Sequence, residues 1–264
     1  MLKNVNIIAR DLPDAWYQCV NKILDEGYIY TITKGSYEGQ KRWEFDYITI
    51  QITHPNSRPL IPDLPPGMAI PPPVESMEAI EKYLPYLMTN EIKENEIYTY
   101  GERLVGASKS NIVERFGSVV ESYFFNKKVD SNERVFNAAE KLKGKSLSSV
   151  NQIQTVIDMF KNTGEGTNQA TMEIGQPSDC GIIDPPCCRL IDCRLRYGKL
   201  HFMVYFRSWD LWGGMPANLA AIQLLKEYMA AEIGCEDGEI IASSKGLHLY
   251  DFSWDLAKLR TYRK

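Results

Sequence analysis

A cysteine preceded by two prolines is the first group in this sequence that could carry out chemistry. Pro185-Pro186-Cys187 stands just before a run of strand-like residues. Proline fixes its own backbone torsion and lacks an N–H, so the pair restricts how the cysteine enters the strand. A cysteine thiolate is a strong nucleophile, and a cationic neighbour favours that form. Cys187 is therefore a candidate nucleophile; a buried thiol at a strand entry is the alternative.

Two further segments carry groups that suit a phosphate and a base. Arg207-Ser208-Trp209-Asp210 closes a predicted strand, where a guanidinium and a hydroxyl together can bind a phosphate. Gly213-Gly214-Met215-Pro216-Ala217-Asn218 leads into a predicted helix, and its glycines let backbone approach a ligand. The Asn218 amide offers a donor and an acceptor together, which suits a pyrimidine edge. Taken singly, Arg207 also fits a surface ion pair and Asn218 a helix cap.

In their order and spacing these segments resemble the thymidylate synthase family. Members carry a Pro-Cys nucleophile before a strand, an Arg-Ser-x-Asp after a hairpin, a Gly-x-Pro-x-Asn entering a long central helix, and a His-x-Tyr. His248-Leu249-Tyr250 supplies the last of these here, and Tyr100-Gly101 is a weaker match in the first half. The resemblance covers residues 149–251 and has the character of the divergent archaeal-type members.

The resemblance implies a role for each matched residue. Cys187 would add to carbon six of a pyrimidine nucleotide, and carbon five would then attack the one-carbon unit of 5,10-methylenetetrahydrofolate. Arg207 would favour the Cys187 thiolate. Glu81, preferred over Glu78, would take the place of a helix glutamate that orders water. The remaining implied roles are phosphate binding by Arg207 and Ser208, base recognition by Asn218, ribose binding by His248 and Tyr250, folate contact by Asp210, and water ordering by Tyr100.

The implied activity is reductive methylation of dUMP at C5. 5,10-Methylenetetrahydrofolate would be the co-substrate that donates both carbon and hydride, no metal would be needed, and the chain would form a homodimer through its sheet. A dCMP, CMP or UMP 5-hydroxymethylase of the same superfamily is the nearest alternative, in which water replaces the hydride. Phage deoxycytidylate hydroxymethylases carry Asp at the position of Asn218, so Asn218 favours uracil, although an amide can flip. A non-catalytic module that binds messenger RNA and a cysteine-dependent hydrolase are further alternatives.

Several positions depart from the family pattern. Many members supply two adjacent arginines from the partner subunit to the phosphate, where this chain has Gly166-Thr167-Asn168-Gln169. Cys188 replaces the usual histidine after the nucleophile, and Phe206 replaces a glutamine. Residues 259–264 lack the apolar end that closes over the folate, so closure would need another device. The basic residues that could replace the lost phosphate charges are Lys34, Lys41, Arg42 and Arg189.

The elements that must position these groups follow from hydrophobic periodicity. Together they predict one α+β domain over 1–264, with a mixed sheet packed by helices that include one long central helix. A hairpin turn is expected at 197–199, a proline-rich loop at 53–74, and charged helical segments within 107–147. The predicted helices are 14–26, about 74–88, 149–160 and 216–233, and the predicted strands are 43–52, 171–174, 188–196, 200–206 and part of 239–251.

Composition limits the class of protein. The 264 residues are 44% hydrophobic and 24% charged, and a net charge of −4 argues against a protein that coats nucleic acid. No apolar run approaches a membrane span, and the first residues do not read as a secretory signal, so a cytoplasmic location is expected. Six cysteines without a Cys-x-x-Cys pair, together with three histidines, make zinc and a disulfide framework weak interpretations.

Overall fold

The computed structural model describes residues 1–33, 37–63, 73–74, 76–92, 98–106, 150–182 and 184–263. The helical segments expected within 107–147 and the side chain of Lys34 lie outside these residues. Glu81 lies within a described helix, but its side chain is outside the description.

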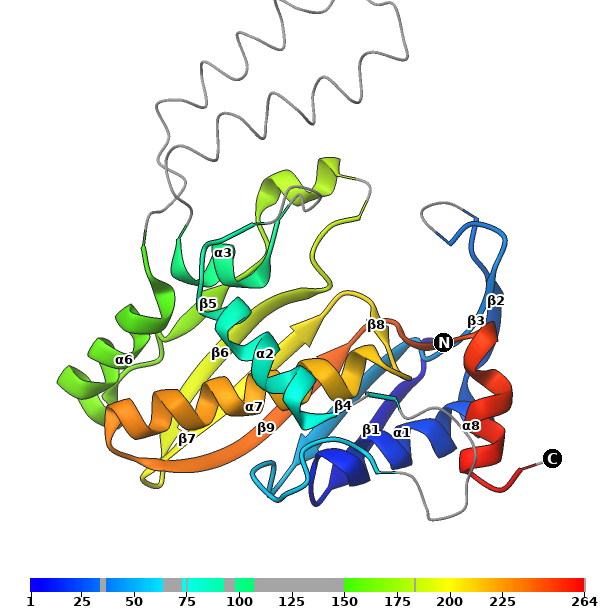
Figure 1. Ribbon diagram of the computed structural model, residues 1–264, viewed down its shortest axis with the longest axis horizontal. Helices are drawn as coiled ribbons and strands as arrows, with labels where there is room; N and C mark the ends of the chain where they lie inside the picture. The colour runs from blue at the N-terminus through cyan, green and yellow to red at the C-terminus, as the bar shows by residue number, and fades with distance from the viewer. Residues whose placement is uncertain are drawn as a thin grey trace, which may run out of the picture.

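Two mixed sheets form the framework (Figure 1). The larger has the order β1-β4-β9-β7-β6-β5, and its strands are β1 (Asn4–Ala9), β4 (Tyr47–Ile52), β5 (Thr171–Glu173), β6 (Cys188–Arg196), β7 (Lys199–Phe206) and β9 (Glu236–Ser244). The smaller has the order β2-β3-β10-β8, and its strands are β2 (Tyr28–Thr31), β3 (Lys41–Glu44), β8 (Trp209–Asp210) and β10 (Leu247–Tyr250). β1 with β4, β7 with β9, and β8 with β10 pair in parallel, while the other neighbours are antiparallel. This confirms the expected α+β class with mixed sheets.

The helices pack mainly against one face of the larger sheet. They are α1 (Leu12–Glu26), α2 (Met77–Leu87), α3 (Tyr100–Val105), α6 (Gln152–Thr163), α7 (Gly214–Ile233) and α8 (Trp254–Arg260). α7 contacts β7 and β9, while α1 contacts β1 and β4 (Figure 1). Along β4 and β7 buried and partly exposed residues alternate, because successive side chains of a strand point to opposite faces. One face of the sheet is therefore core, and the other is open in the single chain.

α7 lies at the centre of the helical layer. It has 20 residues and contacts α1, α2 and α6 as well as the sheet. Leu219, Leu225 and Met229 are almost fully buried, and so are the polar Gln223 and Lys226. The helix ends at Gly234, which adopts the left-handed conformation that glycine tolerates best. Its N-terminal end is where the loop from β8 arrives, so it can present side chains to a site there.

Three sequence expectations need correction. The single strand expected over 43–52 is two strands, because Phe45 donates its N–H to Leu247 of β10 while β4 turns to pair with β1 and β9. The stretch 239–251 holds most of β9 and all of β10 instead of one strand and a turn. The elements β1, β2, β8, α3 and α8 were not among those expected; each is short, so periodicity alone gives them little signal. No helix among the described residues is long and apolar enough to cross a membrane.

Candidate active site

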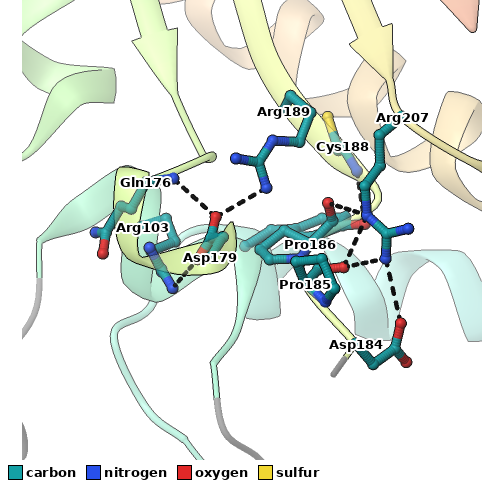
Figure 2. Close-up of polar contacts among 10 residues, drawn as sticks. Arg103, Gln176, Asp179, Asp184, Pro185, Pro186, Cys188, Arg189 and Arg207 are labelled. Carbon is teal, nitrogen blue, oxygen red and sulfur yellow. Dashed lines mark hydrogen bonds and ion pairs between the residues drawn. The ribbon is translucent and has the colours of Figure 1, made fainter. Parts of the chain in front are cut away.

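Cys187 lies at the entry to β6, next to Arg207 at the end of β7. The Arg207 N–H donates to the Cys187 carbonyl over 2.8 Å. Its guanidinium folds back over the turn that precedes the cysteine: Nε lies 3.2 Å from the carbonyl oxygens of both Pro185 and Pro186, and Nη2 lies 3.2 Å from the Asp184 carboxylate (Figure 2). The two proline carbonyls thus hold a cation close to the thiol.

The Cys187 thiol is subject to opposing effects. Burial raises its pKa, and the positive charge of Arg207 lowers it, while Asp184 and Asp210 raise it further. The net shift is upward. Arg207 therefore acts in the expected direction, but burial outweighs it, and the resting thiol is protonated at neutral pH.

Tyr100 is held against the cysteine segment. Its hydroxyl oxygen accepts from the Cys188 N–H over 3.1 Å, so its own proton is free to donate. Burial raises its pKa, and the nearby Cys188 and Cys187 raise it further. Thr99 caps the start of α3, and an added Cβ at Gly101 would collide with the carbonyl oxygens of Tyr86 and Thr89. The Tyr-Gly pair is therefore required by packing as well as by its hydroxyl.

A buried carboxylate that the sequence analysis missed ties α3 to β6. Asp179 is 2% exposed and accepts from Arg103 Nη2 over 3.1 Å, Arg189 Nη1 over 2.8 Å and the Gln176 N–H over 2.7 Å (Figure 2). An added Cβ at Gly175 would lie 2.5 Å from the Arg189 guanidinium, so only glycine leaves room for this arrangement. The sequence signal was the Gln-x-x-Asp spacing of a capping box.

A β-bulge explains how Arg189 reaches that carboxylate. The pairing of β6 with β7 shifts between Cys188 and Leu190, and this places an extra residue in β6. Bulges redirect side chains and are common near active sites. Because Arg189 is paired with Asp179, it is not free to replace the missing phosphate arginines. Arg42, another possible replacement, is also paired, with Nε 2.6 Å from the Glu44 carboxylate.

Asn218 lies within the first turns of α7 and does not cap the helix. Its Oδ1 accepts from the Trp209 indole Nε1 over 3.0 Å. The Trp209 ring stacks on Phe206, with centroids 4.0 Å apart and an interplanar angle of 3°. Phe206, at the position where common family members have glutamine, thus supports the tryptophan that holds Asn218.

His248 on β10 presents a buried acceptor. It is 2% exposed, its Nδ1 lies 2.8 Å from the Gly246 carbonyl, and its Nε2 has no hydrogen-bond partner among the described residues. Burial lowers its pKa to about 4, so the ring is neutral at pH 7. A nitrogen facing a carbonyl must carry the proton, which leaves Nε2 as an acceptor. Tyr250 contacts His248 edge-on at 4.6 Å.

Asp210 organises the loop before α7. Its carboxylate accepts from the N–H groups of Trp212, Gly213 and Gly214 at 3.1, 3.1 and 2.8 Å. Paired in parallel with β10, it lies opposite His248. Ser208, between Arg207 and Trp209, is partly exposed.

Charge interactions indicate that these residues share one region. Asp210 affects the pKa of Cys187, His248 and Tyr250, and Cys187 affects that of Tyr100 and Tyr250. Residues from α3, β6, β7 and α7 therefore lie close to residues from β8 and β10 of the smaller sheet. Among the described residues, no three His, Cys, Asp or Glu side chains lie together as a metal site requires.

Comparison with known proteins identifies the family. The profile of the family described as thymidylate synthase matches residues 100–264, more than half of the chain. The chain belongs to the thymidylate synthase family. The match begins at Tyr100 and includes Cys187, Arg207, Ser208, Asp210, Asn218, His248 and Tyr250, while Glu81 lies before it.

Archaeal members of the thymidylate synthase family match over nearly the whole chain. A Methanosarcina acetivorans protein named "Putative thymidylate synthase" is 28% identical over 252 residues, which are 96% of this chain and 92% of that protein. One of the same name from Methanococcoides burtonii is 30% identical over 250 residues, 94% and 91% of the two chains. The Listeria monocytogenes protein named "Thymidylate synthase" is 33% identical over 104 residues, 39% of this chain and 33% of that protein.

Proposed function

We propose that this chain is a thymidylate synthase, which methylates dUMP reductively at C5 with 5,10-methylenetetrahydrofolate as donor of carbon and hydride. The observation that supports this most is that a thiol, a guanidinium, an amide and a buried imidazole acceptor lie in one region. They belong to Cys187, Arg207, Asn218 and His248. In that order, these groups suit attack on the ring of a pyrimidine nucleotide and binding of its phosphate, base and sugar.

The proposed chemistry begins at the Cys187 sulfur. The thiol loses its proton, and the Arg207 charge stabilises the thiolate that burial disfavours. The sulfur adds to C6 of the base, and C5 then attacks the methylene carbon of the folate. C5 loses its proton, tetrahydrofolate leaves to give an exocyclic methylene, and hydride from the folate reduces it to a methyl group. The sulfur then departs, and dihydrofolate is the second product.

The remaining assigned residues bind and orient. His248 Nε2 accepts a ribose hydroxyl, with Tyr250 beside it, and Asn218 reads the base. Arg207 and Ser208 contact the phosphate; the protein contacts of Arg207 use Nε and Nη2. Asp210 contacts the folate in addition to holding the α7 loop. Tyr100 donates its free proton to ordered water. Glu81 is retained as the helix glutamate of this network on the strength of its place in α2.

We propose that the open sheet face is the contact surface of a homodimer. Tyr47, Gln51, Met203, Tyr205 and Ile241 point away from the helical layer, and each keeps part of its surface accessible in the single chain. Exposed Asn168 and Gln169 lie between α6 and β5, where many members carry the partner arginines. Neutral hydrogen bonds from these amides would replace ion pairs to the neighbouring subunit's phosphate. The single domain and the cytoplasmic location stay predictions.

Product analysis tests the proposed reaction. The protein is incubated with 5,10-methylenetetrahydrofolate and, separately, dUMP, dCMP, UMP and CMP, and the nucleotides are analysed by mass. A methyl product from dUMP with dihydrofolate supports the proposal. A hydroxymethyl product with tetrahydrofolate would assign the chain to the hydroxymethylases. No product from any nucleotide would favour a non-catalytic binding module.

A further inference from the structure

The Asn218 amide is held through its oxygen atom. Trp209 Nε1 lies 3.0 Å from Oδ1, and an indole N–H can only donate, so the atom that faces it must be the oxygen.

Trp209 is itself fixed in place. It is 2% exposed and stacked flat on Phe206, whose ring is fully buried. The indole cannot rotate away without opening a cavity in the core. Turning the amide over would bring Nδ2 against the indole N–H, so that two donors would face each other. The usual freedom of an asparagine amide to exchange its oxygen and nitrogen is therefore absent here.

We propose that Trp209 is a positioning residue that locks the Asn218 amide in the orientation that accepts uracil and rejects cytosine. This inference rests on the proposed function, because it takes Asn218 as the residue that reads the base. It concerns the variable position within Arg-Ser-x-Asp, which the sequence analysis left without a role.

The chemistry of the two bases gives the lock its consequence. With one bond from the indole, Oδ1 keeps one acceptor site, and Nδ2 beside it offers a donor hydrogen. Uracil presents an N3–H donor beside an O4 acceptor and matches this pair. Cytosine presents the reverse, an N3 acceptor beside an N4 donor, and matches only the turned amide. Binding cytosine would thus cost the Trp209 hydrogen bond and leave a buried donor unpaired.

The test measures nucleotide binding without folate. Dissociation constants of dUMP and dCMP are determined by calorimetry for the wild type and Trp209→Phe. Phenylalanine keeps a ring to stack on Phe206 but removes the indole N–H. Loss of one buried hydrogen bond of about 1.4 kcal/mol predicts about a tenfold fall in the dUMP-to-dCMP preference for Trp209→Phe.

A matched control separates positioning from structural damage. Trp254→Phe also removes an indole hydrogen bond, the one to the Leu249 carbonyl over 3.0 Å, but it leaves Asn218 untouched. Its preference ratio should equal that of the wild type, and thermal unfolding shows that all variants are folded. Equal weakening of dUMP and dCMP in Trp209→Phe would overturn the lock and leave the proposed function intact. Failure of the wild type to bind either nucleotide would overturn both.

Discussion

Two arginine clusters flank the same proline-cysteine segment, and they differ in the carboxylate that each contains. Arg189 and Arg103 share Asp179, whose side chain is 2% exposed, while Arg207 contacts Asp184, whose side chain is 73% exposed. A buried carboxylate between two guanidinium groups is costly to remove, since both cations would then lose their shared partner. An exposed ion pair contributes little and is easily replaced.

The comparison separates an arginine that builds the site from one that serves it. Asp179 joins α3, which carries Tyr100, to β6, which carries the cysteines, so its cluster fixes the geometry between them. Arg207 is anchored mainly by backbone carbonyls, and its exposed carboxylate partner can give way to a phosphate. Arginine therefore has a structural role on one side of the Pro-Cys segment, at Arg189, and a ligand-binding role on the other, at Arg207. Variants on the two sides should separate activity from stability.

Arg207→Ala gives the largest expected effect. It removes the proposed phosphate contact and the charge that stabilises the thiolate, so kcat/KM should fall about 1000-fold while the melting temperature shifts by only a few degrees. Steady-state kinetics and thermal unfolding measure the two quantities. The acidic limb of the pH–rate profile should also move to higher pH, because the pKa of Cys187 rises further without the guanidinium. A large loss of stability with activity preserved would place Arg207 among the structural arginines.

Asp179→Ala should lower stability much more than nucleotide binding, the reverse of Arg207→Ala. Removing the buried carboxylate leaves two guanidinium groups without compensation, and the free energy of unfolding should fall by about 3 kcal/mol, as measured by urea denaturation. Nucleotide affinity in the protein that remains folded should change much less. If stability is unaffected, Asp179 does not tie α3 to β6.

The lowered pKa of buried His248 should make the stability of the protein depend on pH. Burial lowers its folded pKa to about 4 from about 6.5 in the unfolded chain, so the unfolded state binds the extra proton first as pH falls. The free energy that neutral, buried His248 contributes to folding is fully present above pH 6.5. It is lost between pH 6.5 and 4, at up to about 1.4 kcal/mol per pH unit. Subtracting the pH–stability curve of His248→Gln from that of the wild type should isolate this slope. Identical slopes would mean that the ring is not buried neutral.

Asp184→Asn should have the smallest effect. Its exposed pair with Arg207 contributes less than about 1 kcal/mol, so the melting temperature should hardly change. Nucleotide affinity should stay the same or rise slightly, since Arg207 loses a competing anion. A loss of activity comparable to that of Arg207→Ala would show that the exposed carboxylate takes part in the site, and the contrast with Asp179 would fail.

The sequence predicted the groups better than their connections. The predicted β6 agrees with the structure, and α7 and β7 differ at their starts by one or two residues, because long periodic segments carry a strong signal. The chemistry of Cys187, Arg207 and Asn218 was visible from residue type and spacing. The Asp179 cluster was not, because the Gln176-x-x-Asp179 spacing indicates only a local cap, whereas the ion pairs join Asp179 to residues 76 and 10 positions away.

The central claim is that the Cys187 sulfur adds to the pyrimidine ring, and release of tritium from C5-labelled dUMP tests it most directly. Addition at C6 must precede loss of the C5 hydrogen, so the label enters water only if the nucleophile acts. The wild type and Cys188→Ala should release tritium in the presence of 5,10-methylenetetrahydrofolate, while Cys187→Ser should release none yet still bind dUMP. Tritium release by Cys187→Ser would contradict the account. So would a folded Cys188→Ala variant that releases no tritium.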